Sequence, residues 1–438
     1  MVATSRAWPF APSFERAPDL WEDKSRALVL GALAIAKREH DSERRDTMRA
    51  LDAFLDGEHR PWLTDRVAEL YPRVAVQWAR KEAGFRYFPL IQMYADRLSV
   101  VMALHAPDTW LEEERTGARL PEDDERSRQW ARDEREVGLA VVLADVERRI
   151  ECGMRQVLVQ PALRRGRLRW DVVRPYQVWV DPDPEAPSEL EGAPHVLVEL
   201  PPAAESDVGA SEALWWTWER LDERDAMGRV SRTDWRCWLH DEAGRLRRNP
   251  LFPDHVNRYG LHPFAVWRRA VPAPGETWLE PNRGWYHQQL AEDVRLMDLD
   301  HHLRHQVHSQ AVAKGGADVA DVPHGPDVVV RSLDAEFDFR YVTPDPKLQL
   351  LLEGFSFDLR ASAVAESLPP DTWEPGGATR NLGAKQLEQH ALRLRRQATI
   401  PHYRAALERT GAIHRGVADA WAEALGRPRY GEGLRLGM

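Results

Sequence analysis

The sequence has few cysteines and contains no long apolar segment. Its two cysteines, Cys152 and Cys237, are too few for a disulfide framework and match no zinc-ligand spacing, so we expect a reducing compartment. The longest apolar run, residues 27–36, is about half the length that a bilayer requires. The N-terminus also lacks a basic stretch followed by an apolar block. The sequence therefore predicts neither a membrane protein nor a secreted one.

Motifs of the common catalytic classes are missing as well. Gly376-Gly377 lacks the Gly-Lys-Ser/Thr ending of a phosphate-binding loop, and Lys314-Gly315-Gly316 follows a predicted helix rather than a strand. No Gly-x-Ser-x-Gly elbow occurs, and neither cysteine has the neighbouring histidine pattern of a nucleophile. We therefore expect a protein that is not an enzyme and carries no cofactor.

Acidic residues outnumber basic ones by 70 to 60, and the formal net charge is −10. This balance argues against a protein that clamps nucleic acid through a broad basic face. It is compatible with a wall along which duplex DNA slides, because such a wall must not grip the phosphates.

Apolar residues at steps of three and four predict helices in the first and last thirds of the chain. The predicted N-terminal helices are Leu20–Glu39, Ser42–Leu55, Tyr87–Leu104 and the amphipathic end of Asp123–Cys152. A long helix is predicted over Trp285–Ala313, striped by Leu296, Leu299, Leu303, Val307 and Ala311. Another is predicted from Lys347, striped by Leu348, Leu352, Phe355 and Leu359 and ended by Pro369. A third starts near Ala384, with a kink expected at Pro401.

The middle third changes to a period near two and predicts a β-rich unit. The expected strands are Gln156–Gln160, Leu168–Val173, Gln177–Asp181, His195–Leu200, Ala213–Glu219, Trp235–His240 and Phe264–Arg269. Two further strands, Asp327–Arg331 and Glu336–Val342, are expected between the long helices. The fold class is therefore α+β.

A histidine-rich stretch favours a second interpretation. His301, His305 and His308 fall on one face of the predicted helix, with Asp298 one turn before them. Imidazoles four residues apart can share a metal ion, so a metal-dependent hydrolase is the alternative function. No distant acidic or histidine motif completes a ligand shell. A solvated or interface helix face is therefore preferred, and no metal is expected.

Tryptophans in the β-rich third allow another interpretation, a stacking platform for sugars or bases. These tryptophans are Trp215, Trp216, Trp218, Trp235 and Trp238. Strand alternation places Trp216 and Trp218 on one face and Trp215 on the other. Aromatic side chains are common in half-buried sheets, so a core and a subunit interface are preferred over a carbohydrate-binding module.

Four passages resemble the portal proteins of long-tailed, double-stranded DNA bacteriophages. Residues 88–110 (FPLIQMYADRLSVVMALHAPDTW) resemble the helix that opens the family's conserved core. Residues 152–187 resemble its passage from a glycine through paired strands to a proline and an acidic turn. Residues 282–316 resemble the first stem helix, and residues 368–394 resemble the end of the second stem helix, the tunnel loop and the following helix. Here Asn381-Leu382-Gly383-Ala384 departs from the Ser-Gly-x-Ala of many relatives, which leaves the loop boundary open by a few residues.

The resemblance implies a portal-type fold with wing, stem, clip and crown parts. Its expected divisions are a helical and β-rich wing at 1–275, a first stem helix at 276–313, a small α/β clip at 314–346, a second stem helix at 347–368, a tunnel loop at 369–383, a kinked wing helix at 384–412 and a short crown or C-terminal tail at 413–438.

The resemblance also implies a homo-oligomeric ring of twelve subunits at one vertex of a viral capsid, through which genomic DNA is packaged and ejected. The expected partners are double-stranded DNA, the large terminase subunit that supplies ATP hydrolysis, the major capsid or scaffold protein, and a head-completion adaptor. The protein would then reside in the virion and, during assembly, in the host cytoplasm. A helix–strand pair–helix excursion cannot bury its apolar stripes alone, and neighbouring copies in a closed ring would cover them.

The segment 370–383, rich in proline and glycine, is the candidate DNA-contacting loop. Weak, symmetric phosphate contacts from such a loop would permit sliding, whereas tight contacts would brake it. The DNA-channel candidates are Trp373, Glu374, Gly376, Gly377, Arg380, Asn381 and Lys385. Lys385 also begins a basic run with Arg393, Arg395 and Arg396. A solvated face is the default for such a run, and channel lining or intersubunit ion pairs remain open.

Overall fold

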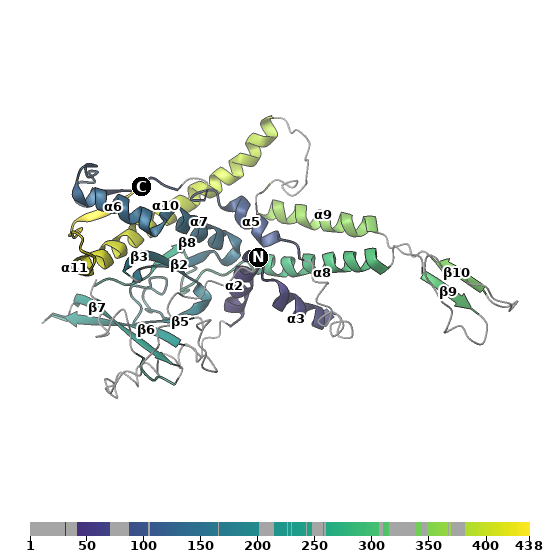
Figure 1. The fold of residues 1–438 in the computed structure, drawn as a ribbon, viewed down its shortest axis with the longest axis horizontal. Coiled ribbons are helices and arrows are strands. Elements are labelled where there is room, and N and C mark those ends of the chain that lie inside the picture. Colours follow the sequence, from purple (N-terminus) through teal and green to yellow (C-terminus); the bar gives the residue numbers. More distant parts are fainter. Residues whose placement is uncertain are drawn as a thin grey trace. The chain divides into compact units, whose positions relative to one another are not determined.

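The computed structural model divides into two compact units, and each is described by itself (Figure 1). The structure describes residues 31, 42–70, 87–103, 106–164, 166–200, 214–225, 227–228, 230–241, 243–247, 257, 260–305, 310–314, 338–342, 348–366, 368 and 382–438. Unit 1 comprises Met1–Gly57, Ile91–Arg283 and Arg393–Met438, and unit 2 comprises Glu58–Leu90 and Gly284–Leu392. Among the described helices, none combines the length and the apolarity of a membrane span.

Local sequence signals set the helices of unit 1. Helix α6 (Glu125–Val137) begins after Asp124, whose carboxylate accepts a 2.8 Å hydrogen bond from the Arg126 amide and so satisfies a free backbone donor. Gly138 has a φ of 69°, which glycine adopts without strain, and it separates α6 from α7 (Leu139–Arg149). A π-helical turn, η1 (Ile150–Met154), follows. The other described helices are α2 (Ser42–Leu55), α5 (Leu90–Leu98, in this unit from Ile91), α10 (Leu382–Ala420, in this unit from Arg393) and α11 (Ala422–Leu425).

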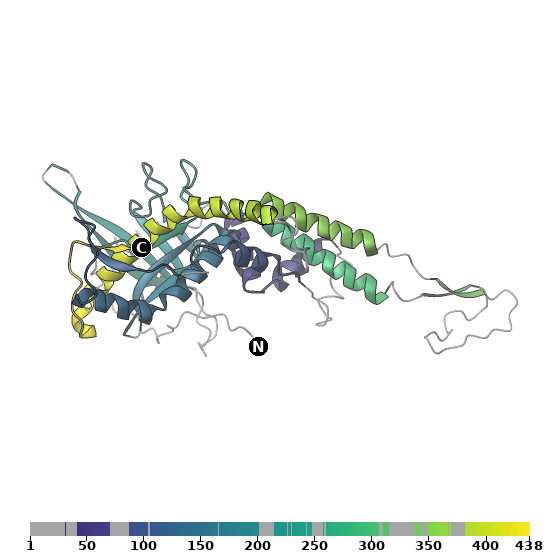
Figure 2. The same ribbon diagram turned by 90° about the horizontal axis from the view of Figure 1, so that it is seen from above.

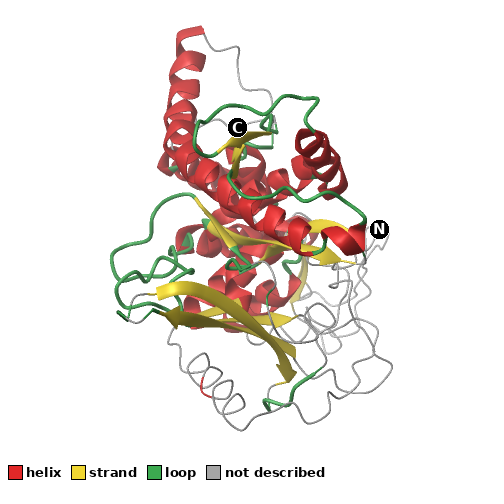
Figure 3. Ribbon diagram, turned by 90° about the vertical axis from the view of Figure 1, so that its left-hand side faces the viewer, coloured by secondary structure: helices red, strands yellow, loops and turns green. Residues whose placement is uncertain are grey.

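The described strands of unit 1 form antiparallel sheets (Figure 3). One sheet has the order β3-β2-β8, formed by β3 (Arg167–Val173), β2 (Gln156–Arg164) and β8 (Ala265–Arg268). A four-stranded sheet follows chain order through β4 (Val178–Asp181), β5 (His195–Leu200), β6 (Leu214–Arg224) and β7 (Val230–Asp241). The short strand β1 (Trp110–Glu113) pairs with β11 (Leu434–Gly437), so the C-terminal segment is bound to the chain just before α6.

The main core of unit 1 lies on one face of the four-stranded sheet. Alternation places Trp216 and Trp218 of β6 on this face, with Trp218 opposite Cys237 of β7. The Trp218 ring meets Phe264 edge-on at a centroid distance of 5.9 Å. Trp215 lies on the other face against Trp179, at 4.7 Å. All five tryptophans that suggested a stacking platform are buried, which confirms the interpretation that they are core residues.

Unit 2 contains a pair of long helices joined through a strand pair. Its described elements are α3 (Arg60–Leu70), α8 (Arg283–His305, in this unit from Gly284), β9 (Gln310–Lys314), β10 (Asp338–Val342), α9 (Leu348–Ala365) and the start of α10. Strands β9 and β10 are antiparallel, with Gln310 opposite Val342 and Lys314 opposite Asp338. Helices α8 and α9 lie side by side in both ribbon views, and the strand pair lies beyond their ends (Figures 1 and 2).

The prediction of a mixed α+β fold is confirmed, as are the strands predicted between residues 156 and 269. The helix predicted to reach Ala313 was wrong at its end, because Gln310–Lys314 is strand β9. A short apolar run fits either period, and pairing with β10 favours the extended form. Residues 413–438 were expected as a short crown or C-terminal tail. In this segment α10 continues to Ala420 and β11 pairs with β1, both within unit 1, and the division into portal parts stays a prediction.

Some sequence predictions are not tested by the structure. The predicted strand Asp327–Arg331 and all of the predicted helix Leu20–Glu39 except Gly31 lie outside the described residues. Helix α10 runs through Pro401 as one element, and a kink at this proline stays a prediction.

Removing the largest buried ring of the main core should destabilise unit 1. Trp218→Ala replaces a fully buried indole with a cavity, and we expect it to lower the free energy of unfolding by about 3–5 kcal/mol. Urea denaturation followed by circular dichroism measures this change. Val141→Ala, at a side chain that is 74% exposed, is the control and should stay within about 0.5 kcal/mol of the parent. Equal effects of the two variants would contradict the assigned core.

Candidate functional site

The candidate site is the helix pair α8–α9 together with the strands between its two helices. One side of α8 is fixed by apolar contacts within unit 2. Val294 and Met297 form a buried cluster with Leu63 and Val67 of α3. The buried residues of α8 are therefore not the stripe that was predicted from Leu296 and its successors. Leu296 and Leu299 are only half-buried. The wrong side of the helix was predicted as the buried one because α3, which covers Val294 and Met297, was not predicted.

A fully buried carboxylate ties the chain before α5 to α8. Asp293 accepts hydrogen bonds from the Phe88 amide at 2.7 Å and from Gln289 Nε2 at 2.9 Å, both on Oδ1. Its Oδ2 lies 2.8 Å from Nδ1 of His59, which is also buried and stacks on Tyr87 at 4.5 Å. Burial raises the pKa of Asp293, although these contacts act in the opposite direction. The carboxylate therefore serves as a structural clamp with most of its hydrogen-bonding capacity used.

Polar contacts also join α8 to α9. Arg295 forms ion pairs with Glu292 on its own helix, at 3.0 Å, and with Asp358 on α9. Gln288 of α8 donates a hydrogen bond to the hydroxyl of Ser362 on α9. Burial raises the pKa of Glu292 to about 7, despite the opposing effect of Arg295. The two helices are thus held in one register by a cross-helix ion pair and a side-chain hydrogen bond.

The opposite face of α9 is apolar and exposed. We call Leu350, Gly354, Phe357, Ala361 and Val364 the α9 stripe. Its members recur at steps of 4, 3, 4 and 3, so they lie along one face of the helix, and all five are exposed. Phe357 is 69% exposed, Leu350 61% and Val364 58%. Inward-facing Leu359 and Ala363 are buried, so α9 carries two apolar faces and the described part of the chain covers only one of them.

This second face was missed by the sequence analysis. The predicted stripe ran through Leu352, which is 51% exposed, and Leu359, which is buried. The signal that could have found it is the spacing of seven between Leu350, Phe357 and Val364. This spacing did not stand out because a helix that is apolar on several sides shows no single periodic stripe.

The predicted DNA-channel residues cannot be assigned to a geometry. Trp373, Glu374, Gly376, Gly377, Arg380 and Asn381 lie outside the described residues. Lys385 lies in α10, but its side chain is outside the described part. Their role therefore stays a prediction.

The basic run that follows is not a uniform surface. Arg395 forms an ion pair with Glu151 of η1, and its side chain is largely buried. Arg393, two residues earlier on α10, is exposed. Arg395 therefore fixes α10 to η1, while Arg393 remains accessible.

The predicted histidine face is only partly described. His301 and His305 lie near the end of α8, without described side chains, and His308 is outside the described residues. Within the part of the chain that the structure describes, no group of three possible metal ligands comes together.

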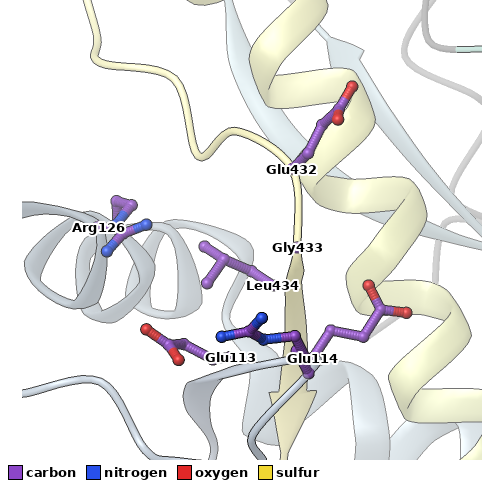
Figure 4. Close-up of a pocket in the computed structure, with 7 residues that line it drawn as sticks. Glu113, Glu114, Arg126, Glu432, Gly433 and Leu434 are labelled. Carbon is purple, nitrogen blue, oxygen red and sulfur yellow. The ribbon is translucent and has the colours of Figure 1, made fainter.

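Unit 1 contains a charged hollow (Figure 4). It has a volume of about 430 Å³ and lies where β1 and β11 meet the start of α6. Its lining residues are Glu113, Glu114, Arg115, Arg126, Glu432, Gly433 and Leu434. Arg126 is already paired with Asp124, at 2.9 Å. The lining contains carboxylates and guanidinium groups, and it supplies neither a histidine nor a hydroxyl or thiol nucleophile.

No known family profile matches the chain, and no curated protein matches it either. Among solved structures, the chain is similar to a protein in the virion of a native gene transfer agent particle, with 13% identity, 84% of each chain covered and a TM-score of 0.41. It is also similar to a chain in the neck of an empty particle of this kind, computed with C6 symmetry, with 13% identity, 84% of each chain covered and a TM-score of 0.43.

The buried Glu292 predicts a pH-dependent stability of the helix pair. Because its pKa is raised from 4.5 to about 7, the folded protein holds a proton that the unfolded chain releases between these values. The stabilisation that this retained proton gives to the folded state is complete below about pH 4.5 and is lost as the pH rises through about 7. Glu292→Gln cannot ionise, so the fall in melting temperature between pH 5 and pH 8 should become smaller in this variant.

Differential scanning calorimetry at both pH values measures the effect. Glu353→Gln, at an exposed position of α9, is the matched control and should leave the pH dependence unchanged. The same pH dependence in Glu292→Gln and in the parent protein would contradict the assignment.

Proposed function

We propose that the chain is the ring-forming subunit of a phage-type portal, through which double-stranded DNA enters and leaves a capsid. The observation that carries the proposal is the helix–strand pair–helix excursion of unit 2, whose returning helix exposes the α9 stripe. Full burial of a side chain such as Leu350, Phe357 or Val364 stabilises a protein by about 1.5–3 kcal/mol, and this gain is missing while the side chain stays in water. A monomer gains nothing from such a face, whereas an assembly covers it.

A closed ring explains the helix–strand pair–helix arrangement of unit 2 better than a symmetric dimer does. Among the described strands, β9 and β10 pair only with each other, and their outer edges would suit pairing with strands of neighbouring copies. Two open edges suit a heterologous interface, in which each copy contacts one neighbour on either side, and such an interface closes into a ring when the rotation allows it. We assign α8 and α9 to the stem and the strand pair to the clip.

The remaining parts follow from this assignment. Unit 1, with its packed sheets, would hold the ring in the capsid, and the strand pair would dock the large terminase subunit and a head-completion adaptor. The segment with Trp373, Gly376, Gly377 and Arg380 would approach the DNA in the channel. Its single arginine and the chain's net charge of −10 suit weak contacts that allow sliding. The ring would have no catalytic activity, since the terminase would supply ATP hydrolysis.

Loss of the α9 stripe should prevent assembly without unfolding the chain. We expect the parent protein to sediment as a species many times heavier than the 50.2 kDa chain. The double variant Phe357→Ser and Val364→Ser should sediment as much smaller species, because both side chains are exposed within one chain and matter only between chains. Sedimentation velocity over a range of concentrations measures the mass, and circular dichroism checks the fold.

Val141→Ser is the control, since it changes an exposed valine of unit 1 that is outside the stripe. It should assemble like the parent protein. A parent protein that stays monomeric at every concentration would refute the proposed function. A double variant that assembles normally would show that the α9 stripe, on which the proposal rests, is not needed for assembly.

A further inference from the structure

A second exposed apolar row lies on α10. We call Leu394, Ala398, Pro401 and Ala405 the α10 stripe. These residues recur at steps of 4, 3 and 4, which places them on one helix face, and all four are exposed. Leu394 is 54% exposed. The neighbouring Tyr403 and Leu407 point the other way and are buried, so this helix also has an inner apolar face and an uncovered one.

The two stripes are complementary in size. The α9 stripe presents the large side chains Leu350, Phe357 and Val364, separated by Gly354 and Ala361. The α10 stripe is built mainly from small residues, with Ala398 and Ala405 on either side of Pro401. Large side chains of one helix pack well into the spaces above small side chains of another. Two different but complementary faces are also what a heterologous contact requires.

Side-chain size selects the orientation of the two helices. An antiparallel arrangement that sets Phe357 against Ala398 also sets Leu350 against Ala405, so that large side chains of α9 meet small ones of α10. A parallel arrangement of the two stripes would instead set Leu350 against Leu394 and Phe357 against Pro401. The antiparallel arrangement is therefore favoured by packing.

We propose that the α9 stripe of one copy packs antiparallel against the α10 stripe of the next copy, and that this contact repeats around the ring. The inference rests on the proposed function, since it names the two surfaces that join its subunits. It assigns to α10 an apolar contact between subunits, beside the intersubunit ion pairs that its basic run left open.

Disulfide trapping tests the proposed contact in the full-length protein. Ala361 and Leu394 lie level in the antiparallel arrangement, whereas Ala361 and Ala405 lie level in the parallel one. A disulfide forms only where the two Cα atoms come within about 7 Å. The double variant Ala361→Cys and Leu394→Cys should therefore give a ladder of covalently linked oligomers on a non-reducing gel after mild oxidation. The native Cys152 and Cys237 are buried and should not react.

The double variant Ala361→Cys and Ala405→Cys is the matched control and should give no ladder. A ladder from this control alone would overturn the antiparallel orientation. A dimer formed by Ala361→Cys alone would mean that α9 packs on α9, and a cross-link within one chain would mean that the two stripes meet inside a subunit; either result overturns the inference.

Sedimentation velocity of the cysteine variants before oxidation distinguishes a failure of the proposed contact from a failure of the proposed function. Rings that form normally but give no ladder from the pair at 361 and 394 would overturn this contact and leave the proposed function standing. A protein that forms no rings under any condition would refute the proposed function and the contact with it.

Discussion

Helix α9 carries two apolar faces, and the described residues of its unit cover only one of them. Leu359 and Ala363 face inward and are buried, while Phe357 and Val364 are exposed. Since the cost of leaving such side chains exposed scales with their apolar area, the chain is most stable when another surface covers them. The outer edges of β9 and β10 have no partner among the described strands. In the proposed ring, neighbouring copies would cover the exposed helix face and pair with these edges.

The inner face of the helix pair is held by polar contacts rather than by apolar packing alone. Asp293, with its partners at His59 and Phe88, orients α8, and Arg295 links α8 to Asp358 of α9. Such directional contacts define the register of the two helices more than they add to the stability of the fold. A defined register is what the outer face needs, since a rotation of α9 would misplace every residue of its stripe. The buried carboxylate of Glu292 makes this arrangement sensitive to pH.

Much of the secondary structure could be predicted from the sequence, and much of the candidate site could not. Strict alternation located strands such as His195–Leu200, and the turn residues between strands limited their ends. The end of α8 was misplaced because Gln310–Lys314 forms a strand through a partner distant in sequence. Helix α3 was not predicted, and without it the buried side of α8 could not be chosen. The α9 stripe was missed because a helix with apolar residues on two faces lacks one dominant period.

Electron microscopy of the purified full-length protein tests the central claim most directly. We expect closed rings with an axial hole that is wide enough for duplex DNA, in which α8 and α9 of every copy surround the axis. Compact particles without a hole, or open filaments, would contradict it, because the exposed helix face would then serve a different kind of assembly.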